Sequence, residues 1–153
     1  MASQFWDDLA EDLDDPEFLR EYIVESVRVA TVDRVMNTLL DAFNAAGLSK
    51  ADLARAIHQQ PASVRRLLSS SHVNPTIGTL AEVAAALGLR ITVEPLPDKE
   101  RQQITEPLLK GSAANPEALV EHLSALRAKD QVKQAVKRPR KPKRTEERQP
   151  LAV

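Results

Sequence analysis

The residues best suited to chemistry form a short polar run from Gln59 to Arg66. An arginine can donate two hydrogen bonds to one guanine, and a glutamine amide can pair with adenine in a similar way. Pro61 and Ala62 offer only apolar contacts, such as one with the methyl group of thymine. The run predicts an element that reads base edges, whereas an ordinary solvated face is the alternative. Its polar members are Gln59, Gln60, Ser63, Arg65 and Arg66.

Further polar residues stand where helix starts and loops are expected. Hydroxyl, amide and ammonium groups at such places donate hydrogen bonds to phosphate oxygens. We expect this role for Ser49, Lys50, Ser71 and Asn74. For His72 a phosphate contact and a plain loop position are equally open.

Two short helices and a third amphipathic helix must position these residues. Ser49 caps the first helix, Pro61 starts the second, and the third runs from Thr76 to Gly88. Asn74-Pro75 predicts a turn between the second and the third. Because the second helix carries the polar run, the layout predicts that it lies in the major groove of DNA. The apolar positions at helical spacing are Leu53, Ala54, Ile57, Val64, Leu67, Leu68, Leu80, Val83, Ala84 and Leu87.

A long helical pattern precedes this region. Residues Pro16–Ala46 have apolar residues at three- and four-residue intervals, with Asp15 as the N-cap and Gly47 as the C-cap. The β-branched pair Thr31-Val32 predicts a break or a bend. Phe5–Leu13 predicts a shorter amphipathic helix, whose aromatic residues pack onto the domain or bind a partner.

The residues after the third helix alternate between apolar and polar. Leu89–Glu94 therefore predicts a short strand that Pro95 ends. Because so short a strand is unstable alone, we expect it to pair across a two-fold axis or with the N-terminal segment. Asn115-Pro116 predicts the start of another helix, with Leu119, Leu123 and Leu126 in register.

The net charge of −1 conceals two strongly charged ends. Residues 1–25 hold nine acidic residues and one arginine, whereas residues 127–148 hold ten basic residues and three acidic ones. We expect the basic end to be disordered and to bind DNA without reading its sequence; a solubilising end is the alternative. The bases at its centre are Lys137, Arg138, Arg140, Lys141, Lys143 and Arg144.

These patterns divide the chain into four parts. We expect an acidic helical arm over residues 1–30, a DNA-binding domain over 31–97, a polar and partly helical extension over 98–136, and a disordered basic tail over 137–153. Apolar residues make up 42% of the chain and aromatic residues only 3%, so the core must be aliphatic.

Composition argues against several classes of function. The chain has no cysteine, and its three histidines lack the spacing of metal ligands. There is no glycine-rich phosphate loop or nucleophile elbow, so we expect no enzyme, no cofactor and no bound metal. The first residues do not form a signal peptide, and no apolar stretch is long enough to cross a membrane. We expect a cytoplasmic protein that is associated with the nucleoid when it binds DNA.

The stretch Leu48–Leu89 resembles the lambda-repressor-like (Xre-type) helix-turn-helix family. The resemblance implies an all-α fold, with base contacts at the positions of Gln60, Pro61, Ala62 and Arg66. This chain departs from the family at three positions, where the family usually has a glycine, a small apolar residue and an acidic residue. They are His58, Gln59 and Leu68. The resemblance rests on Leu48-Ser49, Leu53-Ala54, Val64, Leu67, Asn74-Pro75-Thr76, Thr79-Leu80 and Ala86-Leu87-Gly88.

A second, shorter resemblance concerns the acidic arm. Asp14-Asp15-Pro16-Glu17-Phe18, followed by Tyr22, is similar to the D-P-E-F…Y segment before the helix-turn-helix of HigA-type antitoxins. The two resemblances imply a homodimeric repressor of an inverted-repeat operator, and an antitoxin whose acidic arm binds a basic toxin. The alternatives are a stand-alone Xre-type transcription factor and a nonspecific nucleoid-associated protein.

Overall fold

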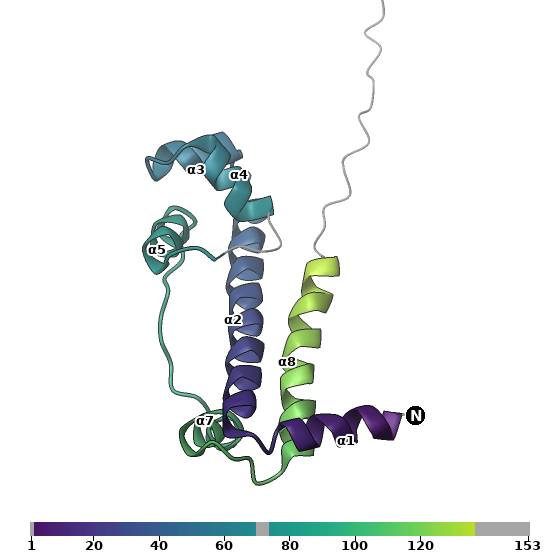
Figure 1. Ribbon diagram of the computed structural model, residues 1–153. Helices are drawn as coiled ribbons and strands as arrows, with labels where there is room; N and C mark the ends of the chain where they lie inside the picture. The colour runs from purple at the N-terminus through teal and green to yellow at the C-terminus, as the bar shows by residue number, and fades with distance from the viewer. Residues whose placement is uncertain (1, 70–73, 137–153) are drawn as a thin grey trace, which may run out of the picture.

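The computed structural model describes residues 2–69 and 74–136, and every regular element within them is a helix (Figure 1). The all-α fold is therefore confirmed. The elements are α1 (Ala2–Asp12), α2 (Pro16–Ala46), α3 (Lys50–Ala56), α4 (Pro61–Ser69), α5 (Ile77–Ala86), α6 (Asp98–Glu100), a π-helical turn η1 (Arg101–Thr105), α7 (Glu106–Lys110) and α8 (Pro116–Val136).

Helix α2 forms the spine of the molecule. At its start the backbone N–H of Glu17 donates a hydrogen bond to Asp15 Oδ1 at 3.0 Å, and at its end Gly47 has a φ of +66°. Both predicted caps are thus confirmed. The predicted break at Thr31-Val32 is wrong, because the helix continues through all 31 residues. Ala30 and Met36, which lie before and after this pair, are both buried. The free energy gained by this packing outweighs the slightly lower helix propensity of β-branched residues.

The described helices form two hydrophobic cores that have only α2 in common. The upper core lies around the C-terminal half of α2, and the lower core around its N-terminal half (Figure 1). The upper core contains Met36, Leu39, Leu53, Ala54, Val64, Leu67, Leu68, Val83 and Ala84. The lower core contains Leu13, Leu19, Ile23, Ile104, Leu119, Val120 and Leu123. Residues before and after the segment α3–α5 therefore pack together, although they are distant in the sequence.

A polar contact closes the lower core. Arg20 on α2 donates hydrogen bonds to the backbone carbonyls of Leu108 and Leu109, at 3.0 and 3.4 Å, near the end of α7. The next turn needs Gly111, whose φ is +75° and whose hydrogen faces the Arg20 guanidinium and the ring of Pro16. A Cβ built there would lie only 2.9 Å from Arg20 Nη2. The close approach ties α7 to the start of α2.

The strand predicted over Leu89–Glu94 is wrong, because residues 89–97 form an extended connector with no β-ladder among the described residues (Figure 1). The N-terminal segment that could have paired with it is the helix α1. Ile91 packs against the upper core, whereas Val93 is 95% exposed. The alternating pattern therefore reflects the docking of two apolar side chains, Leu89 and Ile91. Pairing with a second copy stays a prediction.

Candidate nucleic-acid interface

The turn between α3 and α4 brings these two helices together. His58 has a φ of +54° and is the only residue other than glycine with a positive φ in the described parts of the chain. This left-handed conformation is the one that a glycine would adopt most easily, and histidine tolerates it better than most residues. The following residue closes the helix end, since the N–H of Gln59 donates to the carbonyl of Ala54 at 2.9 Å. The turn is therefore complete without a glycine.

The start of α3 is held by a reciprocal capping box. The N–H of Asp52 donates to Ser49 Oγ at 3.0 Å, and the N–H of Ser49 donates to Asp52 Oδ2 at 3.2 Å. The hydrogen bonds from the side chain and then the backbone of Ser49 hold the pKa of the Asp52 carboxyl below its ordinary value. The polar groups of Ser49 thus already serve the helix start. The spacing Ser-x-x-Asp was the sequence signal for this box, and the sequence analysis recognised only the serine.

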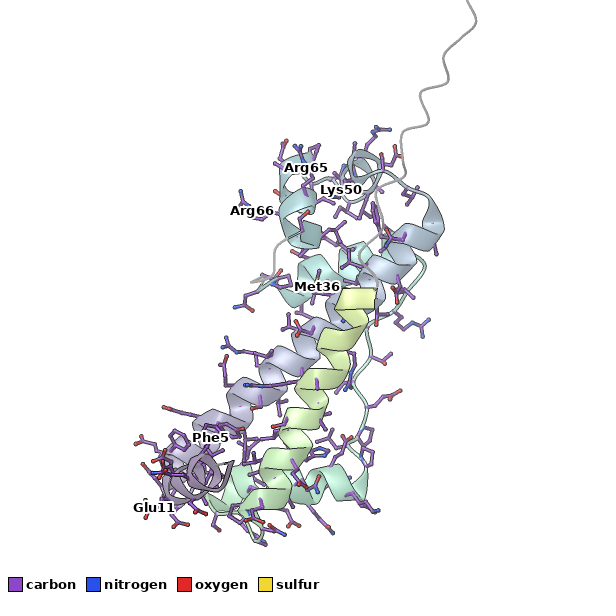
Figure 2. The ribbon with its side chains drawn as sticks, turned by 90° about the vertical axis from the view of Figure 1, so that its right-hand side faces the viewer. Phe5, Glu11, Met36, Lys50, Arg65 and Arg66 are labelled. Carbon is purple, nitrogen blue, oxygen red and sulfur yellow. The ribbon has the colours of Figure 1, made fainter. Side chains whose placement is uncertain are left out.

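Lys50 links α3 to the end of α4. Its Nζ lies 3.3 Å from Ser69 Oγ, to which it donates a hydrogen bond. The side chain is half-buried and lies at the same end of the molecule as Arg65 and Arg66 (Figure 2). Lys50 therefore supports the orientation of α4 in addition to carrying a positive charge. A contact across 19 positions leaves no periodic signal in the sequence, so it could not be predicted there.

Helix α4 has one buried face and one exposed face. Val64, Leu67 and Leu68 lie in the upper core. Leu68 occupies the position where an acidic residue was expected from the resemblance, and its burial explains the exchange for an apolar residue. From Gln59 to Arg66, the exposed positions are Gln59, Gln60, Pro61, Ala62, Ser63, Arg65 and Arg66. The two arginine side chains extend away from the body of the molecule (Figure 2). The structure thus gathers the predicted base-reading residues on one exposed surface, which we call the α4 face.

The segment before α5 contains Asn74, which is predicted to contact phosphate. Asn74 is exposed, and Thr76 caps α5 by accepting a hydrogen bond from the N–H of Thr79 at 3.2 Å. Ser71 and His72 lie outside the described residues, as do the six bases predicted to form the nonspecific DNA tail. The sequence analysis missed Ile77, which is 72% exposed in the first turn of α5. In the sequence, Ile77 stands at the edge of an apolar pattern, and this position does not indicate its exposure.

In residues 2–69 and 74–136, no three histidine or acidic side chains are grouped so that they could hold a metal ion. None of the helices in these ranges is both long and apolar enough to cross a membrane.

Comparison with known proteins identifies the segment that carries the α4 face. Residues 39–93 match a family model described as helix-turn-helix. The match extends from the last turns of α2 to the connector after α5, and it includes all of α3 and α4. No curated protein and no solved structure matches the chain. Helices α1, α7 and α8 lie outside the matched segment.

Proposed function

We propose that this chain, which carries a helix-turn-helix domain of the Xre type at residues 39–93, is a repressor that binds an inverted-repeat operator as a homodimer. The domain itself supports a sequence-specific DNA-binding regulator of transcription. The observation that carries the proposal is the α4 face, which is exposed and polar while the opposite side of the helix is buried. Such a helix is suited to the major groove, where side chains reach base edges.

Each part of the domain has a role in this binding mode. Arg66 reads a guanine through two hydrogen bonds, and Gln60 reads an adenine. Lys50 and Asn74 donate to phosphates on either side of the groove and so fix the register of α4. Pro61 and Ala62 are exposed but apolar, so hydrogen-bonded recognition is concentrated on few side chains.

The two-fold symmetry of an inverted-repeat operator supports a homodimer. Two copies related by a two-fold axis present their recognition helices about 34 Å apart, which is one turn of DNA. Ile77 and Val93 are both highly exposed apolar residues in the matched segment, and they provide surface that a second copy can cover. A footprint upstream of the gene for this protein is expected to show two protected half-sites at that separation.

Arg66→Ala tests the reading of bases. The substitution is expected to weaken operator binding by about 1–3 kcal/mol, or roughly 5- to 150-fold, because one guanine loses its bidentate partner. Binding to random DNA is expected to fall much less. The measurement is a pair of titrations of the full chain, one with the operator and one with random duplex.

Arg28→Ala is the matched control for this substitution. Arg28 is also exposed, but it lies on α2 and forms an ion pair with Glu25 away from the α4 face. The Arg28→Ala substitution removes the same charge as Arg66→Ala and should leave operator binding unchanged. Equal losses on both duplexes with Arg66→Ala would contradict the base-reading role. Equal affinity of the unaltered chain for operator and random DNA would favour a nonspecific nucleoid-associated protein.

A second candidate function, that of an antitoxin, is favoured by the position of the acidic arm. Figure 2 shows Phe5 and Glu11 at one end of the molecule, and Lys50, Arg65 and Arg66 at the other. All nine acidic residues among positions 1–25 are exposed. This end attracts a basic protein partner and leaves the α4 face accessible to DNA. The repressor would then bind toxin and operator at the same time.

Co-expression with the protein encoded in the adjacent reading frame tests the antitoxin function. We expect a complex with the full chain that is lost when Asp7, Asp8, Glu11 and Asp12 are changed to their amides, because the complementary charge is removed. The same variant should keep its operator affinity. Failure of a basic neighbour to form the complex would leave a stand-alone transcription factor as the function.

A further inference from the structure

Helix α1 carries a dense group of acidic side chains on its outer side. Leu9 and Leu13 hold the other side of this helix against the lower core. Four exposed carboxylates, which we call the acidic row, are those of Asp7, Asp8, Glu11 and Asp12. Six helical residues cover about 9 Å, so the row has about one negative charge per 2 Å of axis. Duplex DNA has one per about 1.7 Å, and the two charge densities are therefore similar.

Helix α1 is accessible because it extends past its neighbours. Figure 1 shows that it crosses the start of α8 and continues beyond that helix to the N-terminus. Phe5, in the N-terminal half of α1, is 64% exposed. Asp8 and Asp12 follow Phe5 at three and seven residues, so the three lie along one stripe of the helix. Helix α1 thus presents an aromatic ring followed by carboxylates.

The α4 face has the complementary pattern. Ala62 is followed at three and four residues by Arg65 and Arg66, and all three residues are exposed. In each helix an apolar side chain therefore precedes the charged side chains by one turn. A parallel alignment of the two helices brings Phe5 to Ala62 and, at the same time, Asp8 to Arg65. Charge and apolar surface agree in one register, which favours a specific contact.

The acidic row and the α4 face of one chain cannot meet each other. Phe5 and Glu11 lie at the opposite end of the molecule from Arg65 and Arg66 (Figure 2). Helix α2 between them is continuous over 31 residues and about 46 Å long. Only three residues join α1 to α2, and Leu13 among them is buried in the lower core. The acidic row can therefore reach the α4 face of a second copy only.

We propose that α1 of one copy binds the α4 face of another copy in place of DNA, and so withholds this face from the operator. The proposal rests on the proposed operator binding, because both ligands use the same surface. Each copy offers its acidic end and receives with its basic end, so the contact is heterologous and links copies head to tail. Added salt weakens the contact because both charged surfaces are exposed.

Two complementary variants test the contact by sedimentation velocity of the purified full chain at low salt. The first has amides at the four positions of the acidic row, and the second is Arg65→Ala combined with Arg66→Ala. The unaltered chain is expected to form assemblies that grow with concentration, whereas each variant alone keeps a constant size. An equimolar mixture of the variants should assemble again, because one supplies the α4 face and the other supplies α1.

Further variants separate this contact from an effect of net charge. The matched control has amides at four exposed acidic residues outside α1 and should assemble like the unaltered chain. Phe5→Ala keeps every charge and is expected to weaken assembly by roughly 10-fold, because the apolar contact with Ala62 is lost. Circular dichroism verifies that all forms have the same helix content. The control positions are Glu82, Glu94, Asp98 and Glu121.

Operator DNA provides the competition. Saturating operator duplex should dissolve the assemblies of the unaltered chain, since both ligands need the α4 face. Assemblies that persist with bound operator would place the contact elsewhere. A constant size of the unaltered chain at all concentrations, or a mixture of the two variants that does not assemble, would overturn the proposal. So would equal loss of assembly in the matched control. The proposed function fails separately, if the chain at concentrations too low for assembly shows no preference for operator over random duplex.

Discussion

Leu53→Ala is expected to destabilise the upper core by about 2–5 kcal/mol and to abolish operator binding. Leu53 is completely buried between α2 and the helices of the matched segment, and removal of three carbons leaves a cavity there. A loss of this size is a large part of the total stability of a small domain. Since α3 packs directly on α4, the α4 face loses its support as well. Hydrogen exchange of the backbone amides in residues 39–93 and operator titration measure the two effects.

Ile77→Ala serves as the control for the loss of core packing, and hydrogen exchange is its readout. Ile77 is 72% exposed, so the change removes a similar volume without opening a cavity. It should leave the exchange rates in the core close to those of the unaltered protein. Retention of both slow exchange and operator binding in the Leu53→Ala protein would contradict the assignment of this residue to the core that supports α4.

Leu123→Ala is expected to cost a similar 2–5 kcal/mol, but in the lower core. Leu123 is also completely buried, and it attaches α8 to the lower half of α2. The only tryptophan and the only tyrosine of the chain, Trp6 and Tyr22, belong to α1 and α2 in this lower half. Tyr22 packs against the lower core, so its fluorescence reports on that core. We expect the fluorescence transition to move to lower denaturant concentration.

The helix-turn-helix domain is expected to withstand the Leu123→Ala substitution. Among the residues of α8 whose side chains the structure describes, 116–128, none belongs to the upper core cluster, so amides of residues 39–93 should keep their slow exchange. The preference for operator over random DNA should also persist. A simultaneous loss of protection in both cores would contradict their independence and would show that α2 transmits the damage.

Helix ends were predicted well because they depend on neighbouring residues. Asp15, Gly47, Ser49 and Asn115 all have the predicted capping roles, and each role is decided within about four positions of the chain. The resemblance places His58 where the family usually has a glycine, and its positive φ agrees with that position. The chemistry of neighbouring residues was sufficient to predict these helix ends.

Features that depend on distant parts of the chain were not predicted. Leu19 and Ile23 pack with Leu119 and Leu123 across a hundred positions, and no periodicity within either segment indicates this pairing. The predicted strand failed for the same reason, because a strand needs a partner that the local pattern does not reveal. The exposure of Arg65 and Arg66 followed from their spacing relative to buried neighbours, whereas the contact between Lys50 and Ser69 did not.

The separation of charge along α2 gives the molecule an electric dipole moment. Acidic side chains gather around the start of this helix, and Lys50, Arg65 and Arg66 lie beyond its end. Helix α2, along which the two groups are separated, is about 46 Å long. In the field of a DNA duplex such a dipole experiences a torque that turns the basic end forward before contact. A larger share of diffusional collisions then begins with α4 facing the groove, and added salt weakens this orientation within the Debye length.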